Sequence, residues 1–192
     1  MPRFVLAVGL FFCAVFATGQ DSAVLDREKL KMQLVIHEGK QAKVYKDTEG
    51  ILTVGVGFNL RRRDAKQKIE ALNVDFEKLK SGRESLTDHQ IDQLLEDDID
   101  AAIRDCKSLI PNLANLSDVR QRVLIDMTFN LGKTRLSKFR KMIAAVKAED
   151  FNEAAEEMKD SKWYTQVRRR GKHLTSMMKA NKDVIRELVD GK

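Results

Sequence analysis

The sequence has little of the residues on which several specialised protein classes depend. Only two prolines and ten glycines occur among 192 residues, which excludes collagen-like chains, mucin-like chains and disordered linkers. Two cysteines are too few for the disulfide frameworks of small secreted domains. Three scattered histidines give no paired ligand spacing for zinc, so we expect neither a metal nor a cofactor. Stability must therefore come from an ordinary hydrophobic core.

What is present is the composition of a basic globular protein. Hydrophobic residues make up 43% and charged residues 33%, and the length suits one domain, which can have two lobes. Thirty-five Lys and Arg against 29 Asp and Glu leave a net charge of +6. That charge favours an anionic partner such as nucleic acid, anionic lipid or bacterial cell wall, without distinguishing among them.

An apolar run over residues 4–18 follows Arg3. It has the length of a signal-peptide core and is short for a membrane span. Small residues favour cleavage after Gly19, with Ala17 as an alternative, so residues 1–19 are predicted to be a signal peptide. Removing Arg3 leaves 34 basic against 29 acidic side chains, a net charge of +5. The rival interpretations are an uncleaved membrane anchor and a buried helix of the folded domain.

Two elements are predicted in the first part of the mature chain. Apolar residues recur at helical spacing from about residue 22, and Gly39 is typical of a helix end, so this helix stops just past Glu38. Residues 43–58 predict a strand, a turn and a second strand. Along residues 52–58 apolar residues alternate with Thr53 and two glycines, which gives a small hairpin with one apolar face.

A long helix follows. Thr87 and Gln90 form a capping box, and a 3.6-residue period of apolar residues continues until Pro111 stops it. The helix should span roughly 35 Å, enough to bridge two lobes. Cys106 lies on its apolar face, so we interpret it as a buried hydrophobe; the alternative is a reactive thiol.

The rest of the chain predicts helices alone. A helix from Ser117 to Gly132 has apolar residues around most of its circumference, which is typical of a central helix. Shorter apolar faces follow over residues 139–146, after a cap at Asp150, and over residues 174–188. The fold class is therefore α+β and mostly helical.

Glu38, Asp47 and Thr53 are the candidates for chemistry. Glu38 ends a helix, Asp47 lies nine positions later in a turn, and Thr53 begins the next strand. Glycoside hydrolysis needs one carboxyl group to protonate the leaving oxygen and a second, ionised one to activate water or stabilise positive charge. The spacing alone is weak support, because most of the 29 acidic side chains should be solvated surface groups.

The residues around these candidates resemble a known family. The segment LVIHEGKQAKVYKDTEGILTVGVGF closely resembles the signature of the phage-type lysozymes, the T4 lysozyme family of glycoside hydrolases. The resemblance lies in a Glu-Gly helix end, a Tyr-Lys-Asp-Thr-Glu-Gly turn and a Thr-x-Gly-x-Gly strand. It continues through residues 87–103, residues 120–132 and Trp163-Tyr164, and covers about 160 residues.

This resemblance implies a lysozyme-like α+β fold for one domain over residues 20–192. Its small N-terminal lobe, with the hairpin, would span about residues 20–86. A connecting helix over about 87–110 would lead to a helical C-terminal lobe over about 111–192, with a cleft between the lobes.

The resemblance also implies hydrolysis of the β-1,4 bond between N-acetylmuramic acid and N-acetylglucosamine in peptidoglycan. Glu38 would be the general acid. Asp47 would hold the attacking water together with Thr53, or stabilise the oxocarbenium-like transition state. Phage-type enzymes invert, so the water role of Asp47 is preferred over a covalent nucleophile.

Substrate-binding positions follow from the resemblance less completely. Phe129 matches an aromatic residue at the edge of the cleft, and Arg170 matches a basic residue that would pair with Glu38. The alternatives are that Phe129 belongs to the core and that Arg170 lies in a solvated run of arginines. Asn59, Leu60 and Asn130, which replaces a glutamine, complete the expected substrate contacts. The chain departs from the family at Phe58, Met142, Glu157 and Val167, which affects sugar and peptide contacts.

The remaining charged and titratable groups suggest weaker roles. His37 is predicted to be a surface histidine at a helix end, and the alternative is a cleft histidine that acts on Glu38. The basic clusters at residues 61–63 and 168–172 are predicted to be solvated faces that attract an anionic cell wall, and we expect no nucleic-acid partner. We expect a monomer with peptidoglycan as its partner.

The expected location depends on residues 1–19. With cleavage, we expect a secreted enzyme for antibacterial defence or digestion, without stable membrane association. Without it, the chain would be a membrane-tethered endolysin. A noncatalytic wall binder, a basic membrane-active protein and a chitinase are the other functional alternatives.

Overall fold

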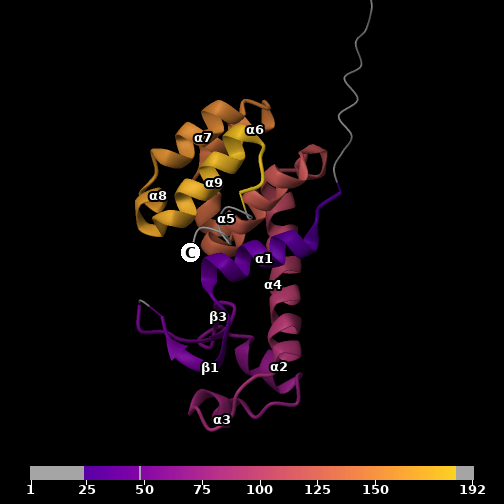
Figure 1. The fold of residues 1–192 in the computed structure, drawn as a ribbon, viewed down its shortest axis with the longest axis vertical. Helices are drawn as coiled ribbons and strands as arrows, with labels where there is room; N and C mark the ends of the chain where they lie inside the picture. The colour runs from indigo at the N-terminus through magenta and orange to yellow at the C-terminus, as the bar shows by residue number, and fades with distance from the viewer. Residues whose placement is uncertain (1–23, 48, 185–192) are drawn as a thin grey trace, which may run out of the picture.

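The computed structural model describes residues 24–47 and 49–184, and these form two lobes joined by a long helix (Figure 1). The predicted signal peptide lies outside the described residues. In Figure 1 the strands and short helices of the N-terminal lobe lie at the bottom and the helices of the C-terminal lobe at the top. The connecting helix α4 runs along the long axis between them, as the resemblance implied.

The N-terminal lobe contains a three-stranded antiparallel sheet in the order β1-β2-β3. Its strands are β1 (Gln41–Lys46), β2 (Leu52–Gly55) and β3 (Phe58–Asn59), followed by α2 (Ala65–Glu70) and α3 (Phe76–Lys80). The predicted hairpin is confirmed, but its second strand is shorter than predicted. Gly55 and Gly57 both have positive φ, at 66° and 72°, and turn the chain, so Val54 pairs with Phe58 on a third strand.

The connecting helix α4 (Asp88–Leu109) has the predicted ends. The Thr87 side chain accepts from the Gln90 amide, and the Gln90 side chain accepts from the Thr87 amide, which completes the capping box. At the other end Ile110 caps the helix directly before Pro111. Cys106 is fully buried on the apolar face, as predicted. The helix therefore fixes the separation of the lobes with local signals at both ends.

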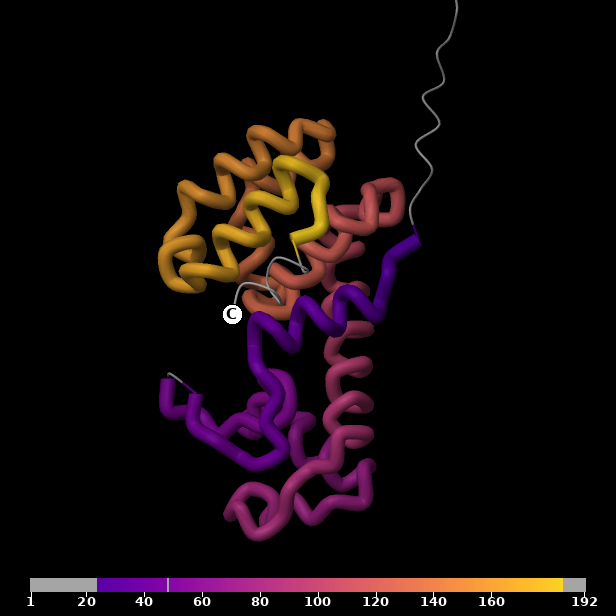
Figure 2. Tube along the Cα trace, in the orientation of Figure 1, coloured from indigo at the N-terminus to yellow at the C-terminus, as the bar shows by residue number. Residues whose placement is uncertain are grey.

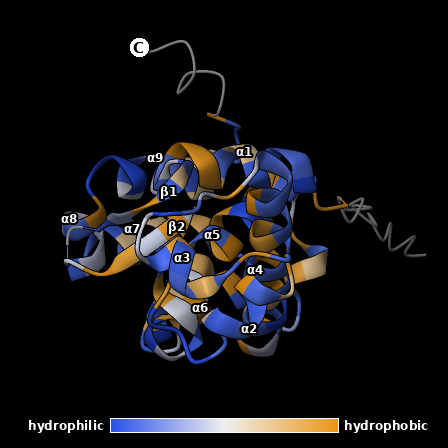
Figure 3. Cartoon of the chain, turned by 90° about the horizontal axis from the view of Figure 1, so that it is seen from below, coloured by the Kyte–Doolittle hydropathy of each residue, from blue (hydrophilic) through white to orange (hydrophobic). Residues whose placement is uncertain are grey.

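The C-terminal lobe is helical throughout its described residues. It contains η1 (Leu113–Asn115), α5 (Asp118–Leu136), α6 (Arg140–Lys147), α7 (Phe151–Lys159), α8 (Lys162–Val167) and α9 (Arg169–Ala180). Helix α5 lies among α4, α9 and α1, and Figure 3 shows its apolar stretches surrounded by the other helices. Inside α5, Gly132 leaves the helical conformation (φ 70°, ψ 160°), which confirms the predicted break at this glycine.

The last described helix ends earlier than predicted. The apolar period predicted a helix to residue 188, whereas α9 ends at Ala180 and Asn181 adopts a left-handed conformation with φ 53°. Asparagine is one of the few residues that favour this conformation. Ile185 and Leu188, which extended the predicted face, lie outside the described residues.

Helix α1 (Arg27–Glu38) carries the candidate acid and contacts the C-terminal lobe. The Asp26 amide donates to Asp118 at the start of α5 (2.8 Å), and Arg27 pairs with Asp100 on α4 (2.8 Å). Figure 2 shows α1 along the lower side of the C-terminal lobe before the chain enters the sheet. The range 20–86 was predicted as one lobe. Within it, the long-range polar contacts of α1 go to α4, α5 and α9.

Within residues 24–47 and 49–184, no helix has both the length and the apolar character needed to span a bilayer.

Candidate active site

Glu38 is the last residue of α1, and three elements hold its carboxyl group. Gly39, with φ 79°, ends the helix and lets the chain turn into the sheet. Glu38 Oε1 accepts from Arg170 Nη1 on α9 at 2.5 Å, so the predicted contact between these residues is present. A Cβ atom added to Gly57 would lie 3.3 Å from Glu38 Oε2, so the β2–β3 turn fits closely against the carboxyl group. The Glu38 side chain is 22% exposed.

Asp47 lies at the start of the turn between β1 and β2, where backbone amides fix its carboxylate. Its Oδ1 accepts from the amides of Glu49 (2.9 Å) and Ile51 (2.8 Å). Short polar side chains commonly bond to amides two residues ahead in turns, so this carboxylate is positioned by its own loop.

Tyr45 lies within electrostatic range of both candidate carboxylates. Its pKa is raised, first by burial and then by the negative charges of Glu38 and Asp47. The helix end and the hairpin turn therefore place both carboxyl groups within electrostatic range of the Tyr45 side chain.

Thr53 is buried in the central strand, with 3% of its surface exposed. It pairs with Tyr45 on β1 and with Asn59 on β3. Side chains of directly paired residues lie on the same face of a sheet, so Tyr45, Thr53 and Asn59 share one face. The Thr53 hydroxyl donates to the Ile51 carbonyl at 3.2 Å, which ties it to the turn that holds Asp47.

A cleft of about 420 Å³ lies between the lobes. Asn59, Phe129 and Asn130, three of the residues expected to contact substrate, line it, and Gly57 connects its wall to Glu38. The other lining residues are Arg62, Asp98, Ala101, Ala102, Asp105, Thr128 and Gly132. Polar side chains in such a cleft suit a hydroxyl-rich ligand.

Leu60 is separate from this cleft. It is 6% exposed and lines a different cavity, with Phe76 and the basic residues around Arg61. The side-chain oxygen of Asn130 already has a partner within the protein, because Oδ1 accepts a hydrogen bond from Trp163 Nε1 at 2.9 Å. The amide nitrogen of Asn130 carries its two donor hydrogens.

A buried polar network behind Glu38 was missed by the sequence reasoning. The fully buried Asp126 on α5 accepts at Oδ1 from Arg170 Nε (2.8 Å), and at Oδ2 from Gln33 (2.7 Å). His37 Nδ1 lies 2.9 Å from the same Oδ2. Burial would raise the pKa of Asp126, but the charge of Arg170 and the hydrogen bond with His37 outweigh it and lower the pKa to about 2. Asp126 is therefore ionised.

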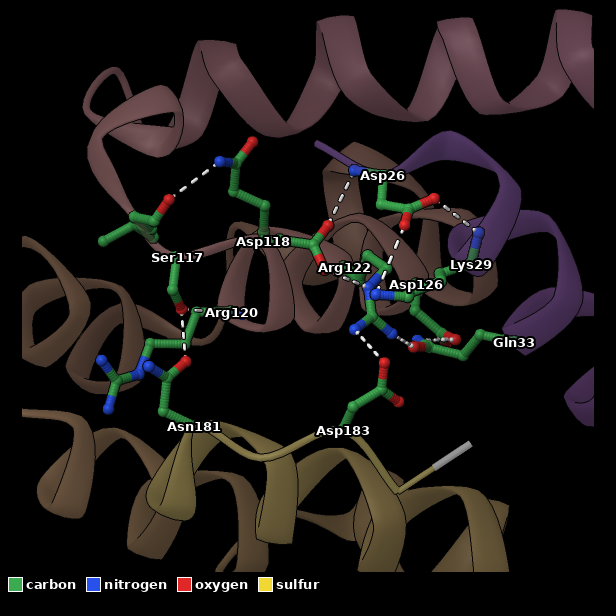
Figure 4. A network of polar contacts seen from close by, with 12 residues as sticks. Asp26, Lys29, Gln33, Ser117, Asp118, Arg120, Arg122, Asp126, Asn181 and Asp183 are labelled. Carbon is green, nitrogen blue, oxygen red and sulfur yellow. Dashed lines mark hydrogen bonds and ion pairs between the residues drawn. The ribbon is translucent and has the colours of Figure 1, made fainter. Parts of the chain in front are cut away.

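The network continues to Arg122, which is fully buried at the centre of Figure 4. Its guanidinium donates to Gln33 Oε1 (2.9 Å), to Asp118 Oδ2 (3.0 Å) and to Asp183 Oδ2 (2.8 Å). Two carboxylates thus accompany this buried cation, as a charge in a low-dielectric interior requires.

Two sequence interpretations are wrong here. His37 was predicted at the surface, but its side chain is 3% exposed because this side of α1 packs against α5, and its ring stacks on His173 at 5.8 Å between centroids. The basic cluster at residues 168–172 was predicted to be a solvated face, but Arg170 within it is 7% exposed because it pairs with Glu38 and Asp126. A signal existed: Gln33 and His37, like Arg122 and Asp126, are polar pairs at i and i+4, and such pairs interact on a helix face.

Among residues 24–47 and 49–184 there is no group of three or more His, Cys, Asp or Glu side chains arranged to hold a metal ion.

Comparison with known proteins identifies the family. Residues 35–183 match the family described as phage lysozyme. "Probable T4-type lysozyme 2" of Dictyostelium discoideum is 31% identical over 156 residues, which cover 77% of this chain and 92% of that protein. "Probable T4-type lysozyme 1" of the same organism is 29% identical, with 78% and 92% covered. "Pre-baseplate central spike protein Gp5" of Enterobacteria phage T4 is 32% identical over 73% of this chain but only 26% of that protein. The chain therefore belongs to the phage lysozyme family, and it is a glycoside hydrolase of the lysozyme type.

Proposed function

We propose that this lysozyme hydrolyses the β-1,4 bond between N-acetylmuramic acid and N-acetylglucosamine of bacterial peptidoglycan, with Glu38 as general acid and Asp47 as the carboxylate that holds the attacking water. The observation that carries this proposal is the fit of Glu38 against Gly57, which lines the cleft between the lobes, together with the charge effect of both Glu38 and Asp47 on Tyr45. Cleavage of a glycosidic bond needs two such carboxyl groups in different roles.

The geometry of Glu38 suits proton donation. Its Oε1 accepts a hydrogen bond from Arg170, so a proton on this carboxyl group sits on Oε2, the oxygen next to Gly57. Gly57 belongs to the wall of the cleft, so we assign the transfer of this proton to a sugar chain bound there. Transfer of the proton to the glycosidic oxygen makes that oxygen a better leaving group.

Asp47 suits the handling of water. Because its Oδ1 already accepts two amide hydrogens, we assign the water to Oδ2. Thr53 lies two residues beyond Ile51, whose amide holds Asp47, and its hydroxyl oxygen provides a second contact for this water. Attack of the water on the face opposite the leaving oxygen inverts the anomeric carbon.

Sugar binding is assigned to Asn59, Phe129 and Asn130 in the cleft. The two amides match the hydroxyl and N-acetyl groups of the substrate, and the ring of Phe129 offers an apolar surface to a sugar face. Arg170 acts on Glu38 instead of the sugar.

The test compares the wild-type protein with Glu38→Gln on peptidoglycan, following turbidity and new reducing ends together. A matched control is Glu28→Gln, which removes a solvent-exposed carboxylate from the same helix. We expect wild type and Glu28→Gln to release reducing ends and Glu38→Gln to lose at least about a hundredfold in rate, because general acid catalysis contributes about that much.

Other outcomes would assign another function. Equal release of reducing ends by Glu38→Gln would contradict its role as the acid. Clearing without new reducing ends in all three proteins would indicate a wall binder or a membrane-active protein, and reducing ends from chitin alone would indicate a chitinase.

We also propose that the enzyme is secreted as a monomer, after cleavage following Gly19, and acts in antibacterial defence or digestion. The support is the apolar run at residues 4–18 and the basic charge that remains without it. Mass spectrometry of the exported protein checks this: a chain beginning at Gln20 is expected, whereas an intact N-terminus in the membrane fraction would indicate a tethered endolysin.

A further inference from the structure

The position of Arg170 poses an electrostatic difficulty for a general acid. Glu38 must hold a proton until it donates it, yet a guanidinium 2.5 Å from its Oε1 favours the ionised carboxylate. Arg170 is 7% exposed, so water screens its charge only weakly.

Asp126 lies on the other edge of the same guanidinium. Its Oδ1 is 2.8 Å from both Arg170 Nε and Arg170 Nη2, and its backbone carbonyl also accepts from Nη2 at 3.3 Å. Gln33 and His37 hold the second oxygen of Asp126. The guanidinium is therefore shared between a fully buried carboxylate and the half-buried candidate acid.

Asp126, Arg170 and Glu38 form a triad whose net charge depends on Asp126. With Asp126 ionised, the triad is neutral when Glu38 is protonated and carries −1 when Glu38 ionises. With a neutral residue at position 126, the same two states would carry +1 and zero. A partly buried site favours the state of lower net charge, so the residue at position 126 decides which state of Glu38 is favoured.

Other charged groups around the triad belong to separate pairs or lie farther along the network. Arg122 on α5 reaches Asp126 only through Gln33 and is accompanied by Asp118 and Asp183. His37 on α1 contacts Asp126 and stacks on His173 of α9, whose pKa is lowered by burial and by the charges of His37 and Arg169. From the sheet, Tyr45 lies within electrostatic range of Glu38 and Asp47.

We propose that Asp126 is a positioning residue that balances the charge of Arg170, so that Arg170 orients the carboxyl group of Glu38 with a smaller electrostatic penalty on its protonated form. This inference rests on the proposed role of Glu38 as general acid. It assigns to α5 a contribution to the chemistry from a side chain that does not touch the substrate.

The experiment measures kcat/KM on peptidoglycan from pH 4 to 9 for wild type and Asp126→Asn. Asparagine has nearly the same shape and keeps an acceptor for Arg170, but it lacks the charge. We expect the alkaline limb of the pH profile of Asp126→Asn to move to lower pH by about one unit. Activity should then fall about tenfold at neutral pH and change little near pH 5. Asp118→Asn is the matched control, because Asp118 lies on the same helix and pairs with Arg122, and its limb should not move.

Arg170→Gln should shift the alkaline limb in the opposite direction. Without the guanidinium, the buried charge of Asp126 should retain the proton on Glu38, so the alkaline limb should move to higher pH. If Asp126→Asn lowers activity equally at every pH and leaves the limb in place, Asp126 is only structural and the proposal is overturned. A shift of the limb in the same direction for both variants would also overturn it.

A readout without catalysis separates this inference from the proposed function. Carbon-detected NMR of the glutamate side chains follows the titration of Glu38, whose signal is identified by its absence in Glu38→Gln. The midpoint should move toward acid in Asp126→Asn and toward base in Arg170→Gln. If wild type released no reducing ends but the midpoints moved in this way, the proposed function would fail and the inference would stand. Unmoved midpoints in folded variants would overturn the inference whatever the activity.

Discussion

Replacing Gly57 with alanine tests how closely the β2–β3 turn holds the candidate acid. Gly57 has φ +72°, and a left-handed conformation costs an L-residue about 1–2 kcal/mol. The new Cβ would lie 3.3 Å from Glu38 Oε2, so the carboxyl group must shift by a few tenths of an ångström. Two effects are therefore combined at this position: backbone strain and displacement of Glu38.

Gly82 separates these two effects. Its φ is +74°, almost the same as that of Gly57, but an added Cβ would meet no atom within 4 Å. Gly82→Ala should therefore show the strain alone. We expect both variants to lose about 1 kcal/mol of stability and to unfold about 2–4 °C lower, as measured by circular dichroism.

The activities should differ. Gly57→Ala should lose about tenfold in the release of reducing ends, measured well below both unfolding transitions, because small misplacements of a reacting group reduce rates strongly. Gly82→Ala should stay within about twofold of wild type, since a surface change away from the site has little effect. Equal activity of the two variants would refute the argument that the β2–β3 turn positions Glu38.

Three other properties can be checked in the same way. Burial raises the pKa of Cys106 to about 11. In the chain that begins at Gln20, Cys106 is the one cysteine, so the folded protein should not react with a thiol reagent at pH 8 and the unfolded protein should; rapid reaction of the folded protein would contradict this. Folding lowers the pKa of Asp126 from 3.8 to about 2, so the ionised carboxylate contributes about 2 kcal/mol to the free energy of unfolding. This contribution is complete above pH 3.8 and is lost as the pH falls through 2. In urea unfolding, the stability of Asp126→Asn should therefore change less with pH between these values than that of wild type. Thr87→Ala removes the side-chain cap of α4 and should cost about 1 kcal/mol in thermal unfolding, and an unchanged transition would mean that the capping box contributes nothing.

Structural features that depend on a few neighbouring residues were predicted correctly. The C-terminal end of α1 follows from Gly39, and the two ends of α4 follow from the capping box at Thr87 and from Pro111. The start of α1 was predicted at about residue 22, whereas the helix begins at Arg27, after the Asp26 side chain caps it. The break at Gly132 likewise depends on the residue present there and its nearest neighbours. Each of these signals acts within one helical turn, so no knowledge of the tertiary fold was needed.

The β2–β3 turn was missed because its pattern is ambiguous. Alternating apolar residues and glycines along residues 52–58 suit an extended strand, and the same glycines permit positive φ. In the structure Gly55 and Gly57 both adopt positive φ, and Val56 lies in the turn between them. This turn brings Gly57 against the carboxyl group of Glu38, a tertiary contact that the local pattern does not reveal.

The network behind Glu38 was missed for a different reason. Gln33 and Asp126 are separated by 93 residues, and His37 and Asp126 by 89. Each polar residue was visible in its helix, but the partner that makes its burial acceptable lies on another helix. Arg170 was assigned to Glu38 through the family resemblance, which did not include Asp126.

The position of α1 also has a consequence for synthesis. This helix emerges from the ribosome early, yet its partners Asp118 and Asp126 follow 92 and 93 residues after Asp26 and Gln33. At about 5–20 residues per second, α1 waits roughly 5–20 seconds for α5 to be made. During that time Gln33 lacks its buried partners Asp126 and Arg122. Helix α1 thus completes its buried polar contacts long after it is made, and a truncated chain that ends before α5 would leave Gln33 and His37 without their partner Asp126.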